Sequence, residues 1–344
     1  MQPELSQFTT IGVGGVPERL RVGTTSDELV AQALEMWSEA DQWLALGGGS
    51  NVVIADDVPN LQVLRVASLG VESAITPSGS VLLKVQAGEN WDDLVAGTVA
   101  AGLAGLEALS GIPGSVGAAP IQNIGAYGAE VAPLIRRVGF LDYLTGEVEE
   151  LDASELGFGY RDSIFKRGKQ GVVLWVELEL QNQGGMSLPI AFGQLATALG
   201  VDSGAQLPVA QVREAVLALR AAKGMVLIAG DTDTASCGSF FTNPVVSARH
   251  ARSLPAEAPK FETTDDDGAT VKLSAAWLIE HAGIHKGFRL GQSRAAVSGK
   301  HTLAITNLGG ATAAEVVQLA EFIQIRVSNQ FGVNLQPEAN LVGF

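Results

Sequence analysis

The stretch TASCGSFFTNP (residues 234–244) places a thiol and a hydroxyl two residues apart, at Cys237 and Ser239. A thiolate is the stronger nucleophile, which leaves two readings open. Either Cys237 is a reactive thiol, or it is a small buried hydrophobe, which is the commonest role of a lone cysteine, and Ser239 does the chemistry. We favour the second reading, and we expect an extended segment here in which the two side chains point in roughly opposite directions.

Two glycine-rich segments have the composition of ligand-binding loops. GGGSN (residues 47–51) lies between two apolar runs, so it is not followed by the helix that a Rossmann fingerprint requires. Its backbone N–H groups suit a phosphate, although an ordinary glycine turn is the alternative. The second segment, residues 110–128, interleaves glycines with small apolar residues and fits neither secondary-structure period. Long loops inside compact domains are usually functional. Together the two segments could bind a flavin cofactor, which has both a diphosphate and a flat ring. Gln122 and Asn123 could form hydrogen bonds with the polar edge of that ring.

Composition narrows the functional class. The 344 residues are 47% hydrophobic and 17% charged, and the formal net charge is −15. Such an acidic chain is not expected to bind nucleic acid or an anionic membrane. No apolar run approaches the ~20 residues of a membrane span, and no signal peptide is visible. One cysteine and four scattered histidines predict neither a disulfide nor a metal site, so we expect a cytoplasmic enzyme without metal.

Local patterns predict the elements that must position these residues. Helices are expected at 26–42 (with Ser26 as N-cap), 90–109, 209–224, 274–283 and 311–332, the last closed by Gly332. Strands are expected on either side of GGGSN and at 62–67, 81–88 and 172–180, with a hairpin at 136–151 turning at Thr145-Gly146. Residues 110–130 are expected to form a loop, and 260–274 a hairpin or loop. Domain boundaries are expected near residues 68 and 205–215.

Five motifs occur in one order that resembles a known family. They are GGGSN, SGIPGSVGAAPIQNIGAYGAE (110–130), GYRDSIFK (159–166), SCGSFFTNP (236–244) and LQPEANLVG (335–343). Together they are similar to the longer branch of the UDP-N-acetylenolpyruvoylglucosamine reductases, and the resemblance runs from about residue 8 to the C-terminus. The second and fourth motifs are highly specific, whereas GGGSN alone is weak.

This resemblance implies an α+β protein with a two-part FAD-binding fold of the vanillyl-alcohol-oxidase type, followed by a C-terminal α+β substrate-binding domain. The implied domains are residues 1–68, 69–212 and 213–344. The implied cofactors are non-covalent FAD and NADPH as electron donor, and the implied partner is a nucleotide sugar, UDP-N-acetylglucosamine enolpyruvate. We expect a monomer or a weak oligomer.

The resemblance also assigns three catalytic residues. Arg161 matches the arginine that binds the substrate carboxylate, a task for which its planar fork is suited. Glu338 matches a glutamate that we expect to be held protonated beside that carboxylate, and Ser239 matches the proton donor. Taken singly, each has a plainer reading: a surface ion pair of Arg161 with Asp162, a solvated C-terminal carboxylate, and a hydroxyl that caps backbone.

Further residues are assigned to cofactor and substrate. The expected FAD-binding residues are Gly47, Gly48, Gly49, Ser50, Asn51, Ser110, Gly111, Ile112, Pro113, Gly114, Gly117, Ala118, Gln122, Asn123, Gly125, Ala126 and Tyr127. The expected substrate-binding residues are Tyr160, Phe192, Arg220, Lys223, Asn243 and His301. Phe192 and Phe261 stand where the family carries tyrosines, so two hydroxyls that would touch the ligand are missing here.

Two other functions compete with the reductase. An FAD-dependent oxidase of the same broad fold often tethers its flavin through histidine or cysteine, but the two glycine segments contain neither residue. A nucleotide-binding regulatory protein without activity is the third reading, and the retained Arg161, Ser239 and Glu338 argue against it.

Overall fold

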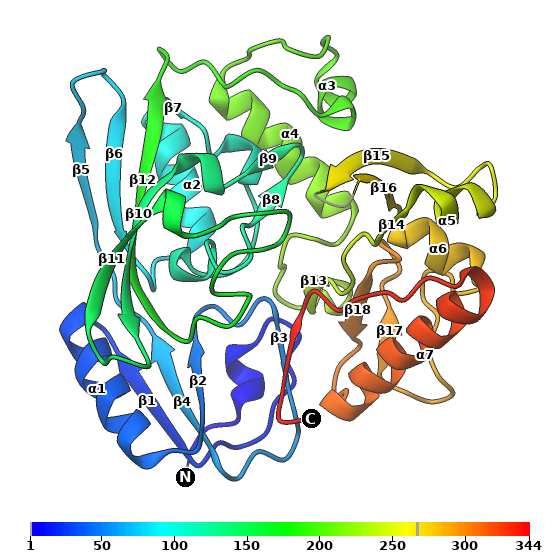
Figure 1. Ribbon diagram of the computed structural model, residues 1–344, viewed down its shortest axis with the longest axis horizontal. Helices are drawn as coiled ribbons and strands as arrows, with labels where there is room; N and C mark the ends of the chain where they lie inside the picture. Colours follow the sequence, from blue (N-terminus) through cyan, green and yellow to red (C-terminus); the bar gives the residue numbers. More distant parts are fainter. Residues whose placement is uncertain (1, 266–267) are drawn as a thin grey trace. The chain divides into compact units, whose positions relative to one another are not determined.

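The computed structural model describes residues 2–265 and 268–344, which divide into two compact units (Figure 1). Unit 1 contains residues 2–3, 17–49 and 59–226, and unit 2 contains residues 4–16, 50–58 and 227–344. The change from one unit to the other therefore falls after Val226, and helix α4 (Val209–Ala222) belongs to unit 1. The three-domain division inferred from the family resemblance stays a prediction.

Unit 1 begins with a small parallel sheet in the order β1 (Arg19–Gly23), β4 (Leu61–Val66), β2 (Gln42–Leu46). Helix α1 (Ser26–Glu39) packs on it through Leu29, Ala33 and Met36, which are fully buried. Their three- and four-residue spacing is that of one helix face. The helix is capped by Thr25, whose hydroxyl accepts from the Glu28 N–H at 3.2 Å, so the prediction of Ser26 as N-cap was wrong by one residue.

The larger sheet of unit 1 is antiparallel, in the order β11 (Val148–Asp152), β10 (Ile135–Asp142), β12 (Gly171–Asn182), β6 (Val81–Gln86), β5 (Val71–Ile75). The short strand β7 (Leu103–Ala104) pairs with the end of β12. The predicted hairpin is confirmed by β10 and β11, with Gly146 in the left-handed region between them at φ +70°.

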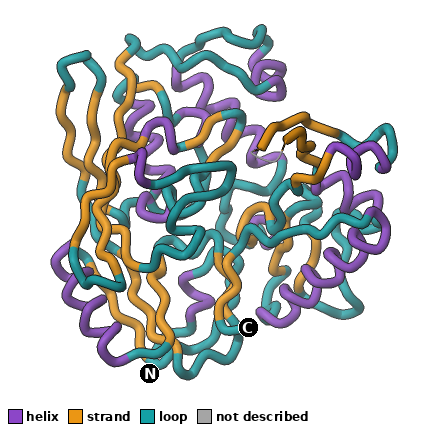
Figure 2. The backbone as a smooth tube through the Cα atoms, viewed as in Figure 1, coloured by secondary structure: helices purple, strands orange, loops and turns teal. Residues whose placement is uncertain are grey.

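Helix α2 (Trp91–Ala100) is shorter than the predicted helix 90–109. It stops because Gly102 adopts φ +70°, after which the chain turns back as β7 and then forms the short 3-10 helix Glu107–Leu109. The glycine-rich stretch that follows is mostly loop, as predicted (Figure 2), with only a 3-10 turn at Val116–Ala118 and the two-residue strands β8 (Gly125–Ala126) and β9 (Ala129–Glu130). Helix α3 (Gly193–Leu199) packs on α4 at the end of unit 1.

Unit 2 joins segments that are far apart in the sequence. Strand β3 (Val52–Ile54), directly after GGGSN, pairs in parallel with the C-terminal strand β19 (Asn340–Val342). Two three-stranded antiparallel sheets follow the orders β13 (Ser236–Ser239), β18 (Ala304–Asn307), β17 (Ala295–Val297) and β14 (Val245–Ser247), β16 (Gly268–Leu273), β15 (Lys260–Asp265). The predicted element at 260–274 is thus a hairpin, and its residues 266–267 lie outside the described part.

The helices of unit 2 are α5 (Ala248–Ser253), α6 (Ala275–His281) and α7 (Ala313–Phe331). Thr312 and Glu315 form a capping box at the start of α7, and Gly332 ends the helix at φ +65°. The face of α7 that carries Leu319, Ile323 and Val327 is buried in the core of unit 2. No helix within residues 2–265 and 268–344 has the length and apolarity needed to cross a bilayer.

Candidate functional site

The two glycine segments of unit 1 touch through their backbones. A Cβ added to Gly48 would lie 2.7 Å from Cα of Gly114, and one added to Gly47 would lie 2.3 Å from Oγ of Ser115. Gly47 and Gly48 need no unusual φ, because neither is among the residues with positive φ. Glycine is required here by the closeness of the second segment, which only a residue without a side chain permits.

This contact leaves polar groups that suit a diphosphate. In the described part of the chain, the N–H groups of Gly48 and Gly114 donate to no protein acceptor. The Ser115 hydroxyl is buried and also has no hydrogen-bond partner there. Backbone N–H groups and a hydroxyl in a concave turn form an anion-binding nest, so the residues present fit the phosphate part of FAD.

Asp92, in the first turn of α2, holds the start of the second glycine segment in place. Its Oδ1 accepts from the Gly111 N–H at 2.6 Å, and its carboxylate pairs in a bidentate manner with Arg213 of α4 at 2.6 and 2.9 Å. Burial by itself raises the pKa of Asp92, but the hydrogen bonds from Arg213 and Gly111 outweigh it and hold the pKa below its ordinary value. One carboxylate therefore ties two helices to the loop.

Arg161 is built into a tight turn beside the same loop. Its backbone is left-handed at φ +53°, and the turn closes through the paired residues Gly159 and Asp162. Its guanidinium donates to the Gly125 carbonyl at 2.7 Å and to the Asn123 carbonyl at 3.4 Å. The plainer reading of an ion pair with its neighbour is wrong, because Asp162 pairs with Arg167.

Arg161 belongs to a cluster of three cations in unit 1, with Arg220 and Lys223 at the end of α4. Burial, with a contribution from the like charge of Arg161, lowers the pKa of Arg220. Burial and the charge of Arg220 likewise lower the pKa of Lys223. Neither Arg220 nor Lys223 has a carboxylate within ion-pair distance in the described residues. Like charges held close together create a positive local potential, which attracts an anion.

A strap formed by residues 187–195 lies over this end of α4 and carries Phe192 and Gln194. The Gln194 side chain accepts from Nζ of Lys223 at 3.0 Å, and the Phe192 ring meets the Tyr127 ring edge-on at 5.9 Å. Nζ of Lys223 also lies 5.8 Å from the Tyr127 ring centre. Phe192 is 41% exposed, and its contact with Tyr127 places it near Lys223 of the cation cluster.

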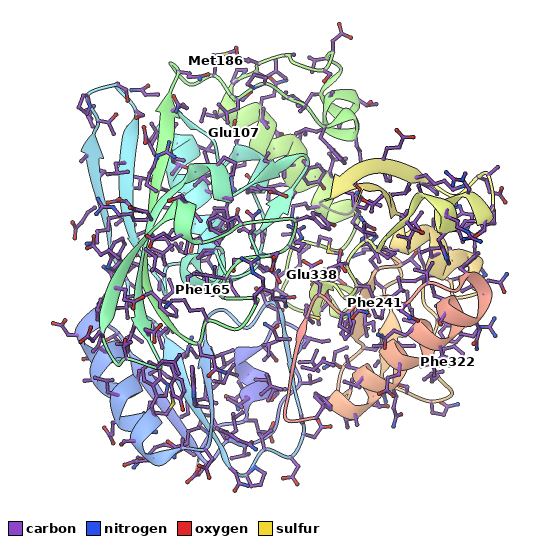
Figure 3. The ribbon with its side chains drawn as sticks, in the orientation of Figure 1. Glu107, Phe165, Met186, Phe241, Phe322 and Glu338 are labelled. Carbon is purple, nitrogen blue, oxygen red and sulfur yellow. The ribbon has the colours of Figure 1, made fainter. Side chains whose placement is uncertain are left out.

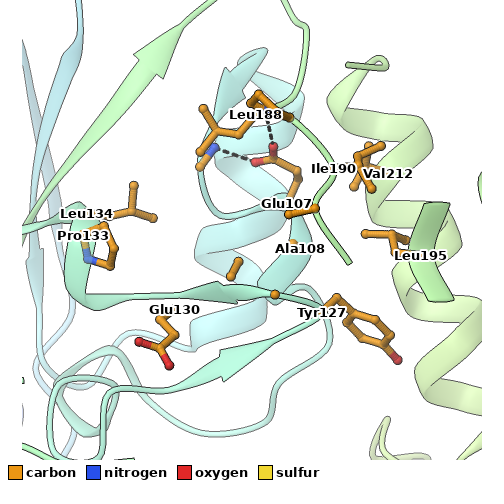
Figure 4. Close-up of a pocket in the computed structure, with 15 residues that line it drawn as sticks. Glu107, Ala108, Tyr127, Glu130, Pro133, Leu134, Leu188, Ile190, Leu195 and Val212 are labelled. Carbon is orange, nitrogen blue, oxygen red and sulfur yellow. Dashed lines mark hydrogen bonds between the residues drawn. The ribbon is translucent and has the colours of Figure 1, made fainter. Parts of the chain in front are cut away.

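Behind the strap is a mainly apolar cavity of about 240 Å³ (Figure 4). The buried Glu107 anchors the strap at one side of this cavity, because its carboxylate accepts from the Leu188 N–H at 2.9 Å and from the Gly105 N–H at 2.5 Å. Tyr127, Ile190 and Leu195 line the other side.

In unit 2, a glycine separates the environments of Cys237 and Ser239. A regular strand would put residues i and i+2 on the same face, but the pairing of β13 with β18 slips by one residue between Ser236 and Ser239. The slip is a bulge at Gly238, which has φ +75°. The Cys237 side chain is consequently buried in the core, whereas Ser239 is partly exposed.

The thiol of Cys237 is unreactive in this position. Burial, and to a smaller degree the charge of Glu338, raises the pKa of Cys237 to about 12. A thiol with that pKa is protonated at neutral pH and is not a nucleophile. The reading of Cys237 as a small buried hydrophobe is confirmed.

The segment that carries Glu338 is held by two neighbouring segments of unit 2, and Glu338 lies close to Phe241 (Figure 3). The Glu338 N–H donates to the Phe240 carbonyl at 2.8 Å, one residue after Ser239. On the other side, its carbonyl accepts from the Asn51 side chain at 3.1 Å. The last residue of GGGSN therefore fixes the segment that carries the C-terminal glutamate, a link between distant motifs within one unit.

Four further expected site residues are divided between the two units. Asn123 is buried, and its side chain is engaged with Glu130, the Gly159 carbonyl and the Ala132 N–H, so it shapes the loop from within. Tyr160 is 44% exposed and lies 5.8 Å under the Arg161 guanidinium, on the same turn. In unit 2, the Asn243 side chain accepts from the Ala275 N–H at the start of α6, and the His301 N–H donates to the Ser298 hydroxyl.

Sequence reasoning missed three residues that shape the site, namely Ser115, Asp92 and Arg213. Ser115 lies inside a quoted motif and could have been included, because serine among glycines is typical of phosphate-binding loops. Asp92 and Arg213 are far apart in sequence, and each alone looks like an ordinary helix charge. Only the packing of α2 against α4 brings them together.

The chain matches two family models and many known relatives. Residues 17–152 match the model of an FAD binding domain, and residues 231–342 match that of the C-terminal domain of UDP-N-acetylenolpyruvoylglucosamine reductase. A UDP-N-acetylenolpyruvoylglucosamine reductase of Leifsonia xyli subsp. xyli is 53% identical over 99% of this chain and 98% of the relative. The chain belongs to the UDP-N-acetylenolpyruvoylglucosamine reductase family. The family resemblance read from the motifs is thereby confirmed.

Other relatives agree. The reductase of Nocardia farcinica is 48% identical over 98% of this chain and 88% of the relative. The crystal structure of the reductase from Thermus caldophilus superposes with a TM-score of 0.68 at 27% identity, covering 99% of this chain and 98% of that one. The chain is thus an FAD-dependent oxidoreductase of peptidoglycan synthesis, and its α+β fold, with an FAD-binding part followed by the family's C-terminal domain, is as predicted.

Proposed function

We propose that this chain reduces the enolpyruvyl ether of UDP-N-acetylglucosamine enolpyruvate to UDP-N-acetylmuramate, with NADPH as electron donor. The observation that carries the proposal is the cluster of Arg161, Arg220 and Lys223 beside the second glycine segment, in a chain whose net charge is −15. Both NADPH and the nucleotide sugar are anions, and such a cluster attracts them against the unfavourable overall charge. We place the reaction in the cytoplasm.

FAD, which the two glycine segments would hold, would supply hydride chemistry when bound: we assign NADPH as the source of the hydride, N5 of the flavin as its donor atom and C3 of the enolpyruvyl group as its acceptor. The protein must make an electron-rich alkene accept it. We assign to Arg161 the binding of the substrate carboxylate, where it stabilises the negative charge that develops as C3 accepts hydride. The Arg161 guanidinium already donates hydrogen bonds to the backbone carbonyls of Gly125 and Asn123. These bonds fix its position, so little reorganisation of the side chain is required when the substrate binds.

Ser239 and Glu338 complete the chemistry from unit 2. The developing carbanion at C2 is a strong base, and we assign its protonation to the Ser239 hydroxyl, which the Gly238 bulge keeps out of the core. Glu338, whose segment is held by Phe240 and Asn51, would donate a hydrogen bond from its protonated carboxyl to the developing enolate.

The remaining assignments concern binding. Lys223, oriented by Gln194, is proposed to bind the diphosphate of either nucleotide, and Arg220 the anionic groups beside the second glycine segment. Tyr160, Phe192, Asn243 and His301 are proposed substrate contacts. Ser115 joins the glycine segments in the proposed phosphate site of FAD.

A pair of substitutions in one strand tests the proposal. We expect Ser239→Ala to keep the bleaching of the flavin by NADPH but to lose about 10²–10⁴-fold in turnover with the enolpyruvyl nucleotide. We expect Cys237→Ala, its matched control, to turn over close to the wild-type rate. The readouts are the visible flavin spectrum in single-turnover reduction and reoxidation. A flavin that bleaches but never passes its electrons to the nucleotide in the wild-type protein would refute the function, and an inactive Cys237→Ala with an active Ser239→Ala would refute the assignment.

A further inference from the structure

The two edge strands of the large sheet of unit 1 differ in how many charged side chains protect them from pairing with another chain. Exposed edges invite pairing with another chain, and charged side chains usually prevent it. At one edge, β11 carries three carboxylates in five residues, Glu149, Glu150 and Asp152. At the other, β5 has the sequence VESAI with a single charge, all five of its residues are exposed, and it is the outermost strand (Figure 1).

The register of the β5–β6 hairpin determines which backbone groups face the open edge. The Thr76 N–H donates to the Ser80 carbonyl and the Gln86 N–H to the Gly70 carbonyl, both at 2.9 Å, so positions 70 and 76 bond toward β6. The register is uninterrupted between them. Because inward and outward positions alternate in an antiparallel strand, the N–H and C=O groups of Val71, Ser73 and Ile75 point away from the sheet.

The side chains of β5 are complementary to those of a second β5 that runs antiparallel about Ser73. In this register, Val71 lies opposite Ile75 of the second copy, and Glu72 lies opposite Ala74. No like charges face each other, and each outward-facing residue meets one that can exchange two N–H···O bonds with it. In the alternative register centred on Glu72, the Glu72 side chains of the two copies would lie opposite each other, which is unfavourable.

Apolar side chains continue the same complementarity. Val71 is 50% exposed and Ile75 is 80% exposed, and through their register partners Val85 and Val81 both lie on the sheet face that covers the main core of unit 1. The Val71–Ile75 pairs on either side of the axis would remove these side chains from water. Cross-strand β-branched pairs of this kind stabilise antiparallel strands.

We propose that β5 pairs with β5 of a second copy of this chain, antiparallel and centred on Ser73, so that two six-stranded sheets join into one. The contact is one short strand per copy and is smaller than the roughly 1,200 Å² of a stable complex. The dimer is therefore weak and concentration-dependent. Since each copy carries a net charge of −15, repulsion opposes association, and added salt tightens the dimer.

Two lysine substitutions at neighbouring exposed positions test the pairing. Ser73→Lys places two ammonium groups opposite each other across the axis, and we expect the dissociation constant of the dimer to rise by about tenfold or more. Ala74→Lys, the matched control, places its ammonium opposite Glu72 of the second copy, and we expect equal or tighter association. Sedimentation velocity of the FAD-loaded protein up to submillimolar concentration measures both, and an unchanged far-ultraviolet circular dichroism spectrum shows that each variant is folded.

Cross-linking tests the register independently. In a Cys237→Ala background, Ser73→Cys puts two thiols on a directly opposed pair with Cα atoms about 5.5 Å apart, which a disulfide can bridge. In the proposed register, position 74 faces position 72 of the second copy, so the two cysteines of Ala74→Cys are out of register by two residues. This variant should cross-link much less under the same mild oxidation. A wild-type chain that stays monomeric at submillimolar concentration overturns the proposal. So does a dimer equally unaffected by Ser73→Lys and Ala74→Lys, or cross-linking that does not favour position 73.

Discussion

The contact between the two glycine segments makes one substitution especially informative. Gly48→Ala adds a single methyl group where the nearest atoms, at 2.7 and 2.9 Å, are Cα and C of Gly114. Because the obstacle is backbone, no side chain can rotate out of the way. An ordinary contact begins at 3.4 Å, so the two segments must separate locally by 3.4 − 2.7 = 0.7 Å.

The second segment cannot yield freely, because it is tied down on both sides of the contact. The Gly114 carbonyl accepts from the Trp91 N–H at 3.0 Å, and the Val116 N–H donates to the Glu89 carbonyl at 2.9 Å. Overpacking against a constrained neighbour costs about 1–3 kcal/mol. For a unit of this size that corresponds to a melting temperature lower by about 2–12 °C. Displacement of the N–H groups of Gly48 and Gly114 should also weaken the binding of FAD.

Thermal denaturation followed by circular dichroism, and the ratio of visible to ultraviolet absorbance of the purified protein, measure the two effects. Gly97→Ala is the matched control, since Gly97 lies within α2 and has no atom within 4 Å of an added Cβ. That change should raise stability by about 0.5–1 kcal/mol. If Gly48→Ala keeps both the melting temperature and the flavin content of the wild type, the account of this contact is wrong.

Three further predictions concern titratable groups. Asp92→Ala should lower the free energy of unfolding by about 2 kcal/mol, because it leaves Arg213 largely buried without its carboxylate; urea denaturation measures this, and an unchanged midpoint would contradict the clamp. The buried Cys237 thiol, with a pKa of about 12, should react with a chromogenic disulfide at pH 8 only as fast as the protein unfolds, so rapid labelling of native protein would contradict its burial. Because the pKa of Lys223 is lowered, its charge is lost at a lower pH than for an ordinary lysine, and KM for NADPH should begin to rise correspondingly early as pH increases. Lys223→Arg should move that rise to higher pH, and an identical pH profile would exclude Lys223 from the binding of the diphosphate.

The sequence alone predicted features that depend on neighbours along the chain. The end of α7 at Gly332 and the turn at Gly146 follow from local conformational preference, and both residues have the positive φ that favours glycine. The glycine-rich loop was visible because its composition fits neither a helix nor a strand. The burial of Cys237 followed from its residue type, and the family followed from motifs whose order and spacing are specific.

Only the tertiary structure decided what depends on distant pairings. No local pattern shows that β3 pairs with β19, that Asp92 binds Arg213, or that a bulge at Gly238 keeps Ser239 partly exposed beside a buried Cys237. These contacts arise because each of their residues would otherwise leave a backbone group, a charge or an apolar surface unsatisfied, and partners for those groups lie far away along the chain. The periodicity of a segment records which face is buried, but it does not record what covers that face.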